Sequence, residues 1–208
     1  NKTASFDQDV YANGLNSTTT FMGAMAVEAT GLHAADLNAK DAYDYNPWSS
    51  VIGYQSGMIS TYGGYDDEYV GATELIFDNG DIVLGGDIDQ TYGRRTSGSK
   101  FDYVFNLGGN ISDFLYLGAN VGISSLDYSY DEYFKEEAID PADFEIGLDN
   151  GETMYFSRMK HRYSYEADGS GYYAKFGVIV TPGAGFRFGA AIQTPTLNTI
   201  TERWQENG

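Results

Sequence analysis

The stretch FLYLGANVGI, Phe114 to Ile123, alternates between apolar side chains and small or polar ones. Its apolar members are Leu115, Leu117, Ala119, Val121 and Ile123, and the residues between them are Tyr116, Gly118, Asn120 and Gly122. A period of two predicts a β-strand with two different faces. A soluble sandwich would turn the apolar face toward a core. A membrane barrel would turn it toward lipid and keep the other face in its lumen.

Three further stretches share this alternation. They are KFDYVFNLGG (100–109), YYAKFGVIV (172–180) and FRFGAAIQT (186–194). The pattern predicts an all-β fold, an antiparallel meander of long strands. Lys175 and Arg187 fall on the small, polar side of two consecutive strands, a side that either a lumen or bulk water would suit.

The connections between these stretches differ in length. GNISD (109–113) and TPGAG (181–185) are short turns, whereas the other connections are long. We expect residues 81–208 to form antiparallel barrel strands, with a long acidic loop at about 129–170 toward which the strand from Phe114 runs on. Short turns at one end and long loops at the other are typical of outer-membrane barrels. ELIFDNGDIVLGG (74–86) predicts an additional hairpin that turns at Asn79-Gly80.

The first part of the chain, residues 1–80, is predicted to be a loop region with two short helices. NSTTTFMGAMAVEATG (16–31) has helical spacing, a possible cap within residues 17–19 and Gly31 as its terminator. NPWSSVIGYQSG (46–57) predicts a second helix with Asn46 at the N-cap, Pro47 at the first position and Gly57 at the end. We expect the acidic segment between them to be a plain connection.

Composition excludes several classes of function. The chain has no cysteine, and its formal net charge of −18 argues against a nucleic-acid partner, which requires clustered Lys and Arg. No apolar run is long enough for a transmembrane helix. His33 and His161 lie outside any nucleophile pattern, and the carboxylate groups lack the ligand spacing of a calcium loop. We therefore expect no enzyme, no cofactor and no metal site.

Two segments carry a family resemblance. FNLGGNISDFLYLGANVGISSLDYSYDEYF (105–134) and YYAKFGVIVTPGAGFRFGAAIQTPT (172–196) resemble the FadL/OmpP1/TodX family of outer-membrane transporters for hydrophobic compounds, in the form associated with Bacteroidetes. The positions that match the family pattern in the second segment are Lys175, Gly177, Pro182, Arg187, Gly189, Thr194, Pro195 and Thr196. The opening residues also look like the outer end of an earlier strand in that family.

The resemblance implies a porin-like transmembrane β-barrel in the bacterial outer membrane, surrounded by lipid or detergent. Family members carry an N-terminal plug, and their helical extracellular loops gather a hydrophobic ligand that leaves through a lateral opening. The resemblance therefore implies that residues 1–80 are an extracellular loop region. This chain departs from that plan, because it lacks the plug motif and has fewer strands than the roughly eight of the smallest closed barrels. We therefore expect an internal fragment that forms part of a barrel.

Seven residues are candidates for contact with a hydrophobic small-molecule ligand. They are Phe21, Met25, Trp48, Ile52, Met58, Lys175 and Arg187. The apolar helix faces could pack on each other, form a capture groove, or do both. The two cations could meet a carboxylate headgroup or pair with wall carboxylates such as Asp102.

The expected function is passage of fatty-acid-like or aromatic molecules across the outer membrane by diffusion. Two alternatives remain open from the sequence. One is a soluble or surface-exposed all-β binding module with the same alternation. The other is a FadL-like barrel that acts as a scaffold for a secretion or surface complex.

Overall fold

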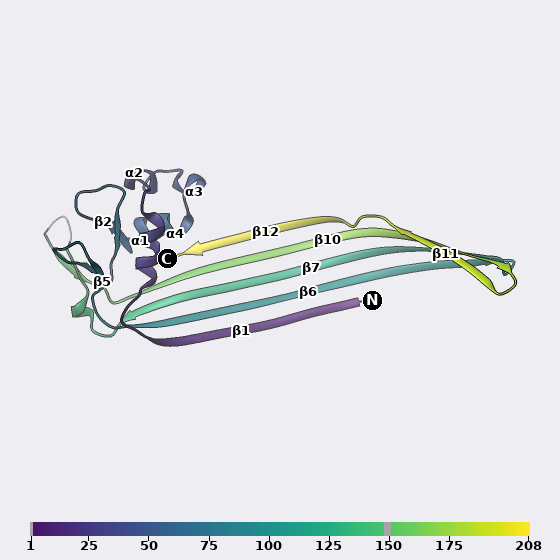
Figure 1. The fold of residues 1–208 in the computed structure, drawn as a ribbon, viewed down its shortest axis with the longest axis horizontal. Coiled ribbons are helices and arrows are strands. Elements are labelled where there is room, and N and C mark those ends of the chain that lie inside the picture. The colour runs from purple at the N-terminus through teal and green to yellow at the C-terminus, as the bar shows by residue number, and fades with distance from the viewer. Residues whose placement is uncertain (1, 148–150) are drawn as a thin grey trace. The chain divides into compact units, whose positions relative to one another are not determined.

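A computed structural model describes residues 2–147 and 151–208 and consists mainly of antiparallel β-structure. The main sheet has the order β1-β6-β7-β10-β11, and β12 also pairs with β10 (Figure 1). These strands are β1 (Lys2–Asn16), β6 (Ile88–Ile111), β7 (Leu115–Ala138), β10 (Arg158–Gly183), β11 (Phe186–Gln193) and β12 (Leu197–Asn207). The prediction of an all-β, antiparallel fold is thereby confirmed.

Strands β11 and β12 use different parts of β10. The Thr194 N–H donates to the Ala174 carbonyl at 2.9 Å, and the Ala174 N–H donates to Thr194 Oγ1 at 3.0 Å. Pro195 follows and cannot donate to a strand ladder, so the regular pairing stops here and resumes with β12.

Both predicted turns join long strands. Between β6 and β7, Ser112 and Asp113 have φ values of 55° and 54°, the left-handed pair that a two-residue hairpin turn needs. Asn110 fixes this turn, because its Nδ2 donates to Asp113 Oδ1 at 2.6 Å and its Oδ1 accepts from the Asp113 N–H at 3.0 Å. The β10–β11 turn passes through Ala184 and Gly185, with φ values of 55° and 80°.

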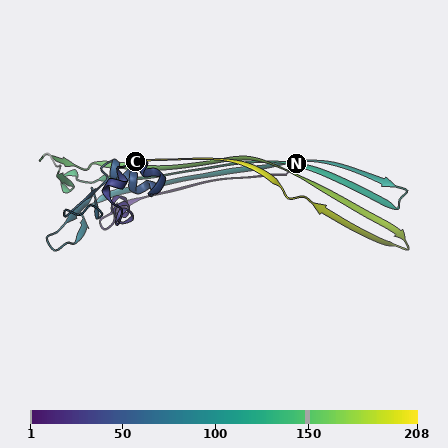
Figure 2. The ribbon, with the colours of Figure 1, turned by 90° about the horizontal axis from the view of Figure 1, so that it is seen from above.

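The chain divides into two compact units, which are described separately. Unit 1 comprises Asn1–Gln8, Arg95–Tyr130 and Tyr165–Trp204. Within it the strands form a single layer, and no element of the unit's described residues covers either face (Figure 2). The apolar side of β7 is open, with Val121 51 % exposed, whereas Gly122 and Ser124 on the opposite side are buried. The predicted alternation is therefore present, but the sheet has no second layer to form a sandwich core.

Unit 2 comprises Asp9–Arg94, Asp131–Ser164 and Gln205–Gly208. Its helices are α1 (Phe21–Ala29), α2 (Ala34–Leu37), α3 (Ala42–Tyr45) and α4 (Trp48–Gln55). Its small hairpins are β2 (Ile59–Thr61) with β3 (Tyr69–Gly71), β4 (Glu74–Ile76) with β5 (Ile82–Leu84), and β8 (Glu145–Gly147) with β9 (Thr153–Tyr155), and a 3₁₀ turn, η1, spans Pro141–Asp143. The hairpin predicted around Asn79-Gly80 is confirmed, with Gly80 at φ 86°.

The two predicted helices are present with slightly different caps. Thr20 caps α1 and accepts from the Met22 N–H, and Pro47 is the N-cap of α4 instead of its first helical residue. Gly31 and Gly57 have the left-handed φ values predicted for terminators, 92° and 75°. The connection expected to be plain also contains α2 and α3, because Leu37 and Ala42 bury themselves in the core beside α4.

The acidic segment predicted as a loop at about 129–170 is shorter than expected. β7 continues to Ala138 and β10 begins at Arg158, so much of that segment is strand. Within unit 2 the charges find partners across the sheet, since Arg162 pairs with Asp131 and Lys160 lies 4.7 Å from the centre of the Tyr133 ring. Cross-strand pairs of this kind stabilise a polar sheet, so acidic composition did not end the strands.

Candidate functional site

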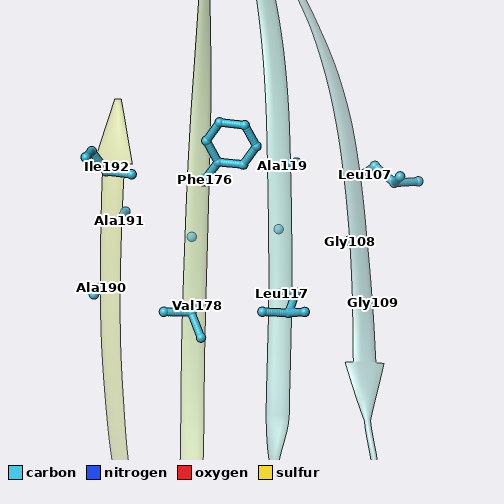
Figure 3. Close-up of a pocket in the computed structure, with 12 residues that line it drawn as sticks. Leu107, Gly108, Gly109, Leu117, Ala119, Phe176, Val178, Ala190, Ala191 and Ile192 are labelled. Carbon is cyan, nitrogen blue, oxygen red and sulfur yellow. The ribbon is translucent and has the colours of Figure 1, made fainter. Parts of the chain in front are cut away.

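The apolar face of unit 1 carries a shallow groove of about 730 Å³. It crosses four neighbouring strands, β6, β7, β10 and β11 (Figure 3). Its lining consists of apolar or small residues, which are Leu107, Gly108, Gly109, Leu117, Gly118, Ala119, Phe176, Gly177, Val178, Ala190, Ala191 and Ile192. The most exposed of the large ones is Leu107, at 79 %. Such a surface has affinity for hydrocarbon and is costly to leave in water.

The opposite face of unit 1 holds a polar pocket of about 510 Å³. Its lining residues are Lys100, Asp102, Val104, Asn120, Ser124, Tyr173, Lys175, Gln193 and Thr196. Tyr173 lies across β7 at Gly122, where an added Cβ would overlap its ring. Lys175 Nζ lies 5.1 Å from the centre of the same ring, within the range of a cation–π interaction.

Lys175 and Asp102 line this one pocket, but Arg187 does not. The register pairs Lys175 with Gln193, which lies six residues along β11 from Arg187, or about 20 Å at the usual strand rise. The two cations predicted to act from neighbouring strands are thus at different levels of the sheet. Among the described residues, Asp102 Oδ1 is buried and has no hydrogen-bond partner.

Three of the predicted ligand-binding residues are in the core of unit 2. Met25, Ile52 and Met58 are only 2 %, 7 % and 8 % exposed, and they belong to one cluster of buried side chains. These three residues therefore show the packing of the helix faces on each other, which the sequence left open beside a capture groove. Capture of a ligand by them stays a prediction.

Phe21 and Trp48 are half-buried in the same unit. The Phe21 ring stacks on Phe134 at 4.9 Å and lies 5.0 Å from the His161 ring. Trp48 donates its indole N–H to the Tyr43 carbonyl at 3.0 Å and meets the Tyr43 ring edge-on. Both side chains are held by specific neighbours, so a ligand would have to bind beside them.

A buried polar network supports the start of α1, and sequence reasoning did not find it. Glu136 of β7 accepts hydrogen bonds from the Phe21 N–H at 2.7 Å, Thr20 Oγ1 at 2.8 Å and Gln90 Nε2 at 2.8 Å. Glu74 lies close by and accepts from the Gly71 N–H at 2.8 Å. Burial raises the pKa of Glu74, and the charge of Glu136 adds to this increase, while the Gly71 hydrogen bond opposes it.

His161 is another residue whose surroundings were not foreseen. Its Nε2 lies 2.7 Å from Glu206 Oε1, and both side chains are 12 % exposed. The sequence places these residues 45 positions apart, so no local signal joins them. In residues 2–147 and 151–208, no three His, Asp or Glu side chains converge in a way that could hold a metal ion.

Comparisons with known proteins do not show which family the chain belongs to. No protein-family model matches the chain, and no curated protein matches its sequence. None of the helices in the described part of the chain combines the length and the apolar character needed to cross a membrane.

Proposed function

We propose that the unit 1 sheet is a section of the wall of an outer-membrane β-barrel, with its apolar face toward lipid. One observation carries the proposal: a single layer of long antiparallel strands exposes large apolar side chains on one face, from Leu107 on β6 to Ile192 on β11. In water this surface would favour aggregation, whereas hydrocarbon would solvate it. The short turns and long connections agree with the same placement.

The proposed activity is passage of hydrophobic small molecules along the other face. Gly118, Gly177 and Ala191 line the apolar groove only with their backbone, and by the alternation their Cβ positions belong to the other face, where absent or small side chains leave room beside the wall. A Cβ added at Gly118 would have no neighbouring group of the described residues within 4 Å. Passage of this kind needs only space and a gradient, and no bond is made or broken.

The same substitution at two neighbouring positions, which face opposite sides of the sheet, tests the membrane placement. Val121→Arg puts a charge on the apolar face, and Asn120→Arg puts the same charge on the polar face of the same strand. Arg facing lipid near the bilayer midplane costs about 2–4 kcal/mol, so we expect Val121→Arg to lower insertion into phosphatidylcholine vesicles and Asn120→Arg to preserve it.

The measurement is vesicle flotation followed by urea titration of the inserted chain. A wild-type chain that remains monodisperse in buffer without detergent and does not float with vesicles would refute the barrel wall. That result would favour the soluble all-β binding module instead.

A further inference from the structure

The tip of the β4–β5 hairpin presents an asparagine followed by a glycine to solvent. Every residue from 76 to 83 is exposed, and Asn79-Gly80 lies in the turn between the two strands. Glycine has no Cβ, so its backbone nitrogen can approach the side-chain amide of the asparagine before it. Attack of that nitrogen on the amide carbon closes a small ring, an intramolecular reaction that proximity favours. Asn79 is therefore a candidate for modification by its own chain.

The turn holds the Asn79 amide by both of its polar atoms. Asn79 Oδ1 accepts from the Asp81 N–H at 3.1 Å, and Asn79 Nδ2 donates to Asp81 Oδ2 at 2.7 Å. An N–H directed at the amide oxygen polarises the carbonyl and stabilises the negative charge that develops there during attack. Because these contacts join residues only two positions apart, they can persist when the hairpin opens.

The attacking nitrogen becomes free only when the tip opens. In the closed turn the Gly80 N–H donates to the Phe77 carbonyl at 2.8 Å. Within the described part of the chain, β4 and β5 have three residues each and pair only with each other. A two-stranded hairpin is marginally stable, and exposed segments with few contacts open more often than the rest of a fold. Opening at Gly80 therefore requires little disruption.

The same dipeptide occurs in β1 under different constraints. Asn13-Gly14 lies within a strand of 15 residues that pairs with β6 in the main sheet. Asn13 Nδ2 donates to Asp89 Oδ1 and to Thr91 Oγ1, both at 3.0 Å. These bonds hold the Asn13 amide against the neighbouring strand, so its reaction requires a larger opening than that of Asn79.

We infer that Asn79 is a self-modification site, where the chain converts its own asparagine to aspartate and isoaspartate with water as the co-reactant. The Gly80 nitrogen bonds to Asn79 Cγ and gives up its proton, the Cγ–Nδ2 bond breaks, and ammonia leaves with that proton. Water then opens the resulting cyclic imide at either carbonyl, adding hydroxyl to the carbon and hydrogen to the nitrogen. Nothing is oxidised or reduced. This site is independent of the membrane placement proposed above.

The reaction also changes the hairpin that carries it. The new carboxylate has no proton to donate to Asp81 Oδ2, and the two negative charges repel each other. The isoaspartate form adds a methylene group to the backbone of the turn. We therefore expect the pairing of Ile76 with Ile82 to weaken after conversion.

Peptide mapping by mass spectrometry tests the inference on the full chain, incubated in a nonionic detergent at mildly alkaline pH. We expect conversion at Asn79 to be about tenfold faster than at Asn13, or more, which corresponds to a difference of about 1.4 kcal/mol in the free energy of opening. Incubation in concentrated urea should make the two rates similar, because both asparagines precede a glycine and only the fold distinguishes them.

Asn79→Gln is the matched control, since it keeps the amide but would have to close a larger ring. This variant should show no conversion at position 79 and an unchanged rate at Asn13. An unmodified Asn79 in the folded chain, or conversion of Asn13 at the same rate or faster, would overturn the inference. A preference for Asn79 that is equally large in urea would overturn it too, because the hairpin would then not be the cause.

Discussion

At the scale of single residues, two positions on one face of β7 impose different limits on similar glycines. Gly122 faces the Tyr173 ring so closely that a Cβ would overlap it, while Gly118 has open space on the same side of the strand. Both glycines interrupt the alternating pattern in the same way, so their sequence context does not distinguish them. The difference comes from a neighbouring strand and is a tertiary effect.

Gly122→Ala and Gly118→Ala form a matched pair. We expect Gly122→Ala to lower the free energy of unfolding by about 1–3 kcal/mol, the usual cost of overpacking, because Tyr173 must move. Gly118→Ala should be neutral or should stabilise by about 0.4–1 kcal/mol through the unfolded state. Urea denaturation in detergent measures both values, and equal costs for the two variants would contradict the packing of Tyr173 on Gly122.

Glu74 gives unit 2 a dependence on pH. Its folded pKa is raised, chiefly by burial, so the folded unit binds more protons than the unfolded chain over the interval between the two pKa values. The contribution of Glu74 to stability is therefore fully present below the ordinary pKa of a Glu and is lost as the pH rises through the raised value. We expect Glu74→Gln to reduce this loss.

Thermal unfolding followed by circular dichroism at about pH 4 and about pH 7 checks this expectation. Glu145→Gln, a change at an exposed carboxylate of the same unit, is the control. A melting temperature of Glu74→Gln that changes with pH as much as that of the wild type would show that Glu74 is not the source.

At the scale of elements, turns and strands were the parts best predicted from sequence. A period of two extends over many residues, and GNISD and TPGAG interrupt it at the places where the chain reverses. Helices α2 and α3 were missed because four residues contain hardly more than one helical turn, too little to show a period. The extent of β7 and β10 was missed because their partners are charged residues far away in sequence.

The β6–β7 turn can be tested at Ser112, which has a left-handed φ of 55°. Gly tolerates this conformation without the roughly 1–2 kcal/mol that an L-residue incurs, so Ser112→Gly should raise the free energy of unfolding by up to about 1 kcal/mol. Ser112→Val should lower it, because a β-branched residue fits this region poorly. Urea titration measures the free energy of unfolding of both variants. A Ser112→Val variant as stable as Ser112→Gly would exclude this turn geometry.

At the scale of the whole molecule, the sites lie between segments that are distant in the sequence. The polar pocket combines residues from β6, β7, β10 and β11, and of its cations the sequence selected only Lys175. Glu136 meets the Phe21 N–H across 115 positions. No periodicity within a segment carries such information, so the faces of the strands could be predicted while the partners of Glu136 and His161 could not.

The order of the segments along the chain has a consequence for biosynthesis. Both units include parts of β6, β7 and β10, and His161 finds Glu206 only after β12 has been made. Glu136 follows Phe21 of helix α1 by 115 positions, so the Phe21 N–H meets its acceptor only after β7 has been made. Contacts of such long range close slowly. The hydrogen bonds of the Phe21 N–H and of His161 therefore cannot form until the segments that carry Glu136 and Glu206 have been synthesised.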